Sequence, residues 1–172
     1  MNFLLRVCVF SIILAGITIG SANFASAQIV ALGSSTVDDQ RVASNERWPA
    51  VLEEMLRAKG SPTHVTNAGV WGETTEGTLS RVSSSVPDGT KTVILMVNGH
   101  NDANKLSQGA AGAAANVAAI KNQLKARGIK VIDAMGIYVS VVKQPGMAVT
   151  DRIHLSVEGN KKVAAILAGM VR

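Results

Sequence analysis

The segment KTVILMVNG, residues 91–99, decides the fold class of this 172-residue chain. Five consecutive apolar residues, VILMV at 93–97, show no alternation of polar and apolar side chains. A strand that is apolar on both sides is typical of a parallel sheet, because helices cover both faces of such a sheet. The segment therefore predicts a strand that is buried on both faces.

Short apolar runs alternate with helical segments on either side of this strand. We predict further strands at 28–32, at 63–69 and within 129–139. Helices are predicted at 48–60, 76–86, 110–128 and about 157–171, the last with Ser156 as its N-cap. The alternation indicates βαβ units, so we predict an α/β fold: a three-layer α/β/α sandwich with a short, mostly parallel sheet of four to five strands.

The first 27 residues have the pattern of a secretory signal peptide. A basic start precedes an apolar run at 7–19, and Ala25, Ser26 and Ala27 form a small-residue cleavage site. The run is shorter than the roughly 20 residues that a membrane-spanning helix needs. We expect a periplasmic or secreted protein with one domain over residues 28–172 and no transmembrane segment after cleavage. An uncleaved anchor is the alternative.

The composition of the chain argues against several kinds of protein. Its one cysteine, Cys8, lies in the predicted signal, so the mature chain has no disulfide and no thiolate. The formal net charge is +5, but the basic residues are scattered and no aromatic residues lie among them, so we expect no nucleic-acid partner. The three histidines have no metal-ligand spacing, so no metal site is expected. The oligomeric state stays open.

Small and polar residues follow the predicted strands. GSS at 33–35, NAGVWGETT at 67–75 and NGHND at 98–102 all stand at carboxyl ends of strands, where open parallel sheets form their sites. A serine hydroxyl becomes a nucleophile when a histidine, oriented by a carboxylate, accepts its proton. The segment DRIH offers one such pair, Asp151 and His154. A surface turn that caps the last helix is the alternative for this segment.

Taken in order, these four segments resemble the blocks of the SGNH hydrolase superfamily, the GDSL-like lipases and esterases, which centre on Ser, Gly, Asn and His. The resemblance extends from residue 29 to the C-terminal helix. It is greatest for the bacterial thioesterase and lysophospholipase-like branch, where segments similar to NAGVWGETT and DRIHLSVEGNKKVA recur. The resemblance implies a flavodoxin-like fold and a serine hydrolase.

The resemblance also implies a role for each block. Ser35 is the nucleophile, His154 the general base and Asp151 the acid that orients it. The backbone N–H groups of Ser35 and Gly72 and the side-chain amide of Asn101 form the oxyanion hole. The implied reaction is the cleavage of a carboxylic ester or thioester through an acyl-enzyme, without a cofactor, on a small-molecule or lipid ester substrate. No G-x-S-x-G segment is present, which argues against the α/β-hydrolase fold.

Two residues next to the implied oxyanion donors, Trp71 beside Gly72 and His100 beside Asn101, have roles that the sequence leaves open. Trp71 either forms an apolar wall for an acyl group or packs in the core. His100 either lines the pocket or has a structural role. Asp102 is expected to be structural, and His64 to be an exposed polar residue.

The chain departs from the family pattern at two places. Ser34 stands where the family usually has Asp, so Ser34 is a rival nucleophile to Ser35. The segment 135–150 is shorter than in relatives, which often insert a helix and a strand there, so we expect only four full strands and a reduced acyl wall. The alternative functions are a catalytically silent binding protein of the same fold and a carbohydrate O-acetyl esterase.

Overall fold

The computed structural model describes residues 28–105 and 109–171. The predicted signal peptide lies outside these residues. The described part contains four strands: β1 (Gln28–Gly33), β2 (Val65–Gly69), β3 (Thr90–Met96) and β4 (Lys130–Asp133). They form one sheet in the order β2-β1-β3-β4, in which every pair is parallel. The predicted α/β fold and the expectation of four full strands are confirmed.

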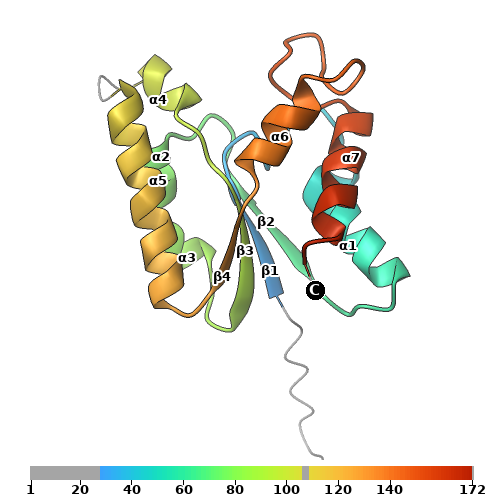
Figure 1. Ribbon diagram of the computed structural model, residues 1–172, viewed down its shortest axis with the longest axis horizontal. Helices are drawn as coiled ribbons and strands as arrows, with labels where there is room; N and C mark the ends of the chain where they lie inside the picture. The colour runs from blue at the N-terminus through green and yellow to red at the C-terminus, as the bar shows by residue number, and fades with distance from the viewer. Residues whose placement is uncertain (1–27, 106–108, 172) are drawn as a thin grey trace, which may run out of the picture.

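Helices lie on both faces of the sheet, so the molecule has three layers (Figure 1). One face carries α1 (Trp48–Ala58), α6 (Met135–Val142) and α7 (Val157–Ala168). The other face carries α2 (Thr75–Ser80), α3 (Val82–Ser85) and α5 (Gly109–Ala126), while η1 (Ser44–Glu46) and α4 (His100–Lys105) are short. None of the helices in residues 28–105 and 109–171 is long and apolar enough to cross a membrane.

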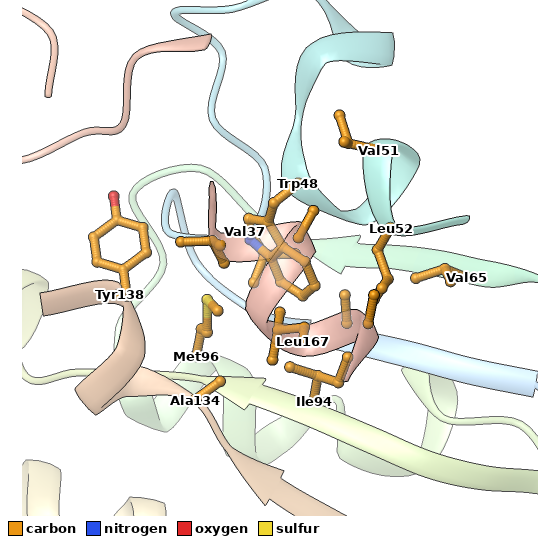
Figure 2. Close-up of a cluster of buried hydrophobic side chains, with 14 of the residues drawn as sticks. Val37, Trp48, Val51, Leu52, Val65, Ile94, Met96, Ala134, Tyr138 and Leu167 are labelled. Atoms are coloured by element: carbon orange, nitrogen blue, oxygen red, sulfur yellow. The ribbon is translucent and has the colours of Figure 1, made fainter. Parts of the chain in front are cut away.

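Side chains of the central strands alternate between two hydrophobic clusters. Ile94 and Met96 of β3 face the layer of α1, α6 and α7, where Trp48, Leu52 and Leu167 pack (Figure 2). The intervening residues of β3 pack with the second cluster, beneath α3 and α5. Because both faces of β3 are buried, its sequence is an unbroken apolar run. The sheet is therefore a rigid platform for the loops at its carboxyl end.

Two predicted elements differ from the structure. The strand predicted within 129–139 ends at Asp133, and the residues from Met135 onward form helix α6. A short apolar run fits a strand or a buried helix equally well. Here Tyr138 and Val141, three residues apart, are buried on one side of a helix and pack into the first cluster.

The helix predicted at 76–86 is divided at Arg81 into α2 and α3, and α4 was not predicted. The other predicted helices are present with shifted ends. The side chain of Ser156 accepts a hydrogen bond from the Gly159 N–H at 3.1 Å, so the predicted N-cap of α7 is confirmed.

Candidate active site

The turn after β1 presents Ser35 at the carboxyl end of the sheet. Gly33 lies so close to β3 that a Cβ on it would be 2.3 Å from the Met96 carbonyl oxygen, so glycine is required there. The Ser34 carbonyl closes the turn by accepting the N–H groups of the third and fourth residues after it, both at 3.0 Å. Ser34 is buried, whereas Ser35 is partly exposed. Ser35 is thus the more accessible of the two candidate hydroxyls.

The loops after β2 and β3 are tied to each other beside this turn. Gly72 has a φ of 71°, in the left-handed region that favours glycine. The Asn101 side chain donates one N–H to the Glu73 carbonyl at 2.8 Å, and an amide has a second N–H to offer. Asp102 is fully buried and accepts the Thr75 N–H at 3.0 Å and its hydroxyl at 2.5 Å. Asp102 therefore has the structural role expected of it.

Arg81 connects the ends of two strands to the Gly72 loop. Its guanidinium donates to the carbonyls of Gly33 and Ala68, both at 3.0 Å. It also forms two hydrogen bonds to the Glu73 carboxylate, at 2.7 and 2.6 Å. A planar guanidinium holds a carboxylate in a fixed orientation through such paired contacts. Arg81 thus fixes the loop of Gly72 relative to the end of β1.

The segment DRIH forms a turn that orients the His154 ring. One oxygen of Asp151 accepts the N–H groups of Ile153 and His154, both at 2.9 Å, and the other lies 2.8 Å from His154 Nδ1. The Tyr138 hydroxyl supports the turn by donating to the Ile153 carbonyl at 3.0 Å. His154 Nε2 is buried and has no hydrogen-bond partner among the residues that the structure describes. With its proton on Nδ1, the imidazole would present Nε2 as a proton acceptor.

Hydrogen bonds keep Asp151 ionised. Burial acts to raise the pKa of its carboxyl, but the backbone N–H groups of His154 and Ile153 and the His154 ring outweigh burial and lower the pKa to about 2. The opposite holds for Asp39, whose pKa burial raises. Asp151 is therefore negatively charged at any ordinary pH and stabilises a positive charge on the neighbouring imidazole.

These pKa shifts predict how acid affects stability. The unfolded chain protonates Asp151 near pH 3.9, so the stabilising effect of its ionised form is complete above about pH 4 and is lost as the pH falls toward 2. The difference in free energy of unfolding between the native chain and Asp151→Asn should therefore shrink between about pH 4 and 2 in urea titrations. Asp39→Asn is the matched comparison: because burial raises the pKa of Asp39, the native chain should gain stability relative to Asp39→Asn as the pH falls toward about 4, and the difference should change little below that pH. A pH-independent difference for Asp151→Asn would contradict this assignment.

Arg41 and Trp71 enclose the Asp151–His154 pair. The Arg41 Nε atom is 2.8 Å from the Asp151 oxygen that also contacts His154. The Arg41 guanidinium carbon lies 4.8 Å from the centre of the Trp71 ring. Trp71 in turn stacks on the His154 ring, with 4.8 Å between centroids and 18° between planes. The four side chains thus form a closed ring of contacts, which limits rotation of the imidazole.

Loss of the Arg41 side chain should lower activity moderately. Arg41→Gln removes the ion pair and the cation–π contact, and we expect kcat/KM for a chromogenic ester to fall about 3- to 10-fold, with Arg41→Lys retaining more activity. Arg57→Gln, which breaks an ion pair on α1, is the matched control and should leave kcat/KM unchanged. Equal effects of Arg41→Gln and Arg57→Gln would show that the ring of contacts does not matter for turnover.

The predicted residues of the four blocks meet in one pocket of about 330 Å³. Its lining includes Ser34, Ser35, Trp71, Gly72, His100, Asn101 and His154. Asp151 lies behind His154, and His64 is elsewhere, exposed and 2.7 Å from a carboxylate oxygen of Glu53. A larger hollow of about 720 Å³ lies beside α1 and β2 and contains none of the predicted site residues. Within the described ranges, no group of three or more His, Cys, Asp and Glu side chains is arranged to hold a metal ion.

Several residues of the site were not predicted from the sequence. Arg41 and Arg81 belong to no local pattern. One wall of the pocket, which consists of Met135, Tyr138, Val139 and Val142 of α6, was not predicted either. Their spacing of three, four and seven residues is a helical signal that would have identified this face. The expected reduction of the acyl wall is thus offset by an apolar face of α6.

The chain belongs to the GDSL-like lipase/acylhydrolase family, whose model matches residues 31–168. No match was found among curated proteins. The match to the family model covers all four blocks, from the end of β1 to α7.

Several solved structures have the same fold. The crystal structure of TesA is 18% identical, with 84% of this chain and 98% of TesA covered and a TM-score of 0.69. Esterase EstA from Pseudoalteromonas sp. is 14% identical, with 83% and 95% covered and a TM-score of 0.69. AlinE4, an SGNH-hydrolase family esterase, is 23% identical, with 85% and 95% covered and a TM-score of 0.58. At these identities the similarity shows the fold, and the family model shows the family.

Proposed function

We propose that this protein is an exported serine hydrolase that cleaves carboxylic esters through an acyl-enzyme on Ser35. The observation that carries the proposal is the contact of Asp151 with His154 Nδ1, which leaves Nε2 unpartnered in the described residues at a pocket that Ser35 also lines. A serine, a histidine and a carboxylate in this relation are the elements of nucleophilic acyl transfer.

The proposed reaction has two halves. The Ser35 hydroxyl attacks the ester carbonyl while His154 Nε2 takes its proton, and the carbonyl oxygen becomes an oxyanion. The N–H groups of Ser35 and Gly72 and the amide of Asn101 are the proposed donors to it. His154 then gives its proton to the departing alcohol. A water molecule then attacks the acyl-enzyme while His154 takes its proton, and the bond between the acyl carbon and the Ser35 oxygen breaks as His154 returns that proton to the oxygen, which releases the acid and restores the Ser35 hydroxyl.

The pocket and the predicted export together favour esters as substrates. A volume of about 330 Å³ with an apolar α6 wall suits an acyl chain of modest length. If the predicted signal peptide directs export, acyl-CoA thioesters would rarely be met outside the cytoplasm. Simple esters, lysophospholipids and O-acetylated glycans are therefore more plausible substrates than thioesters. N-terminal sequencing of the exported protein should give Gln28 as the first residue.

The proposal is tested with 4-nitrophenyl esters from acetate to long acyl chains, with Ser35→Ala assayed in parallel. Turnover that vanishes in the variant supports a serine hydrolase. The acyl chain length that gives the highest kcat/KM indicates how long an acyl chain the pocket accommodates. A fluorophosphonate probe supplies an independent readout, since EstA was solved in a form inhibited by monoethylphosphonate. If the mature protein neither hydrolyses any ester nor reacts with the probe, the silent binding protein becomes the better hypothesis.

A further inference from the structure

Two cationic side chains line the candidate active-site pocket. They are Lys143, directly after α6, and Arg152, from the DRIH turn. No Asp or Glu side chain is among the described residues of the lining. The apolar wall of α6 ends directly before Lys143, and Val139 and Ile153, which also line the pocket, expose 37% and 44% of their surface. The pocket thus combines an apolar wall with positive charge.

Neither cation is neutralised by a carboxylate in the part of the chain that the structure describes. Most arginines elsewhere have such a partner, for example Arg47 with Asp38 and Arg81 with Glu73. The acid nearest to Arg152 in the sequence is Asp151, and that carboxylate already binds Arg41 and His154. An anion that enters the pocket would therefore meet two charges that are not already paired.

The backbone at Arg152 adds a second observation. Its φ of 58° is left-handed, and among the described residues it is the only non-glycine residue with a positive φ. This conformation is unfavourable for an L-residue and is the one that glycine adopts most readily. The turn fixes it, because the Arg152 N–H bonds to the Val149 carbonyl at 3.0 Å and Asp151 accepts the next two N–H groups. A long charged side chain thus occupies a position that favours glycine, and it lines the pocket.

The length of α6 sets the distance between the two ends of this wall. The helix begins at Met135, whose sulfur lies 3.7 Å from the side-chain amide of Asn98, in the loop after β3. It ends at Val142, immediately before Lys143. At 1.5 Å per residue, the start of α6 and Lys143 are about 12 Å apart along the helix axis. With C–C bonds of about 1.5 Å, an extended chain of about six carbons covers roughly half of that distance.

We propose that Lys143 and Arg152 form an anion-binding subsite, and that the preferred substrates are esters with a carboxylate or phosphate at the far end of a short apolar chain. The inference rests on the proposed ester hydrolysis, because the subsite belongs to the same pocket. The anionic group lies on the acyl part or on the alcohol part of the substrate. Both cases use the same charge-assisted hydrogen bonds.

The acyl case is tested with two esters of equal carbon number, 4-nitrophenyl hexanoate and mono-4-nitrophenyl adipate. We expect kcat/KM to be about 10-fold higher for the adipate ester, and the ratio to fall to about 1 in the Lys143→Gln/Arg152→Gln variant and at high salt. The matched control is Lys91→Gln/Lys125→Gln. It also removes two cations that have no carboxylate partner in the described structure, but neither of these lysines lines the pocket. The control should keep the ratio of the native protein.

The alcohol case uses hexyl acetate and the acetate ester of 6-hydroxyhexanoic acid, with release of acetate as the readout. If the preference for the charged ester depends on Lys143 and Arg152 in one of the two ester pairs and not in the other, that pair identifies the side of the substrate on which the anion lies. If the ratios of both pairs are the same in the native protein and in the Lys143→Gln/Arg152→Gln variant, the subsite is refuted while ester hydrolysis stands. If no ester is hydrolysed and no fluorophosphonate is bound, the proposed function and the subsite fall together.

Discussion

Replacing Ser35 with alanine is expected to reduce kcat/KM for 4-nitrophenyl esters by at least about 10,000-fold without loss of the fold. The variant has no hydroxyl to form the acyl-enzyme, while its oxyanion donors and its pocket remain. Because Ser35 is partly exposed and its side chain has no hydrogen bond in the described structure, its removal disturbs no packing. The melting temperature should therefore stay close to that of the native protein.

Ser34→Ala is the matched control, since it removes the neighbouring hydroxyl. Ser34 is 4% exposed, and the turn that it closes uses its backbone carbonyl, which alanine retains. We expect kcat/KM to stay within about tenfold of the native value and fluorophosphonate labelling to persist. Labelling that is lost in Ser34→Ala and kept in Ser35→Ala would reverse the assignment of the nucleophile.

His154→Ala is expected to have an effect of similar size, because Ser35 then has no base to accept its proton. The substitution leaves a space behind Trp71, which stacks on the His154 ring in the native protein. Imidazole added to the solution has the same ring as the missing side chain, so it should act as the base in this space and restore part of the turnover. A variant that is inactive because its fold is disturbed would not show this rescue. Measurements of kcat/KM with and without imidazole check both expectations.

Two further variants complete this test. Asp151→Asn keeps the shape of the side chain but removes the charge that stabilises the imidazolium, so we expect a loss of about 100- to 10,000-fold. His64→Ala removes an exposed histidine outside the pocket and should be without effect. A His154→Ala variant with more than about a tenth of the native activity would eliminate the Ser35–His154–Asp151 mechanism.

The parallel sheet and the convergence of the four blocks at one of its edges follow from local patterns. The run at 93–97 predicted a strand buried on both faces, and β3 is such a strand. Because parallel strands end at the same edge of the sheet, the residues that follow them were expected to converge. Ser35, Gly72 and Asn101 do line one pocket with His154. The contact between Asp151 and His154 is also local, since a turn of three residues brings them together.

Other parts of the site depend on contacts between distant segments, which leave no local pattern. Arg41 meets Asp151 across 110 positions of sequence, and Arg81 reaches back to the carbonyl of Gly33. Helix α6 has the apolar composition of a strand, and its helical form is decided by the burial of Tyr138 and Val141 against the sheet.

The α/β class and the succession of the blocks can be predicted from the sequence, because burial on both faces and polar residues at strand ends are properties of short segments. The side chains that surround the Asp151–His154 pair and the cations that line the pocket are known only from the folded chain. Those contacts depend on how helices and loops pack over the sheet, and packing brings together residues whose sequence neighbours carry no trace of the partner.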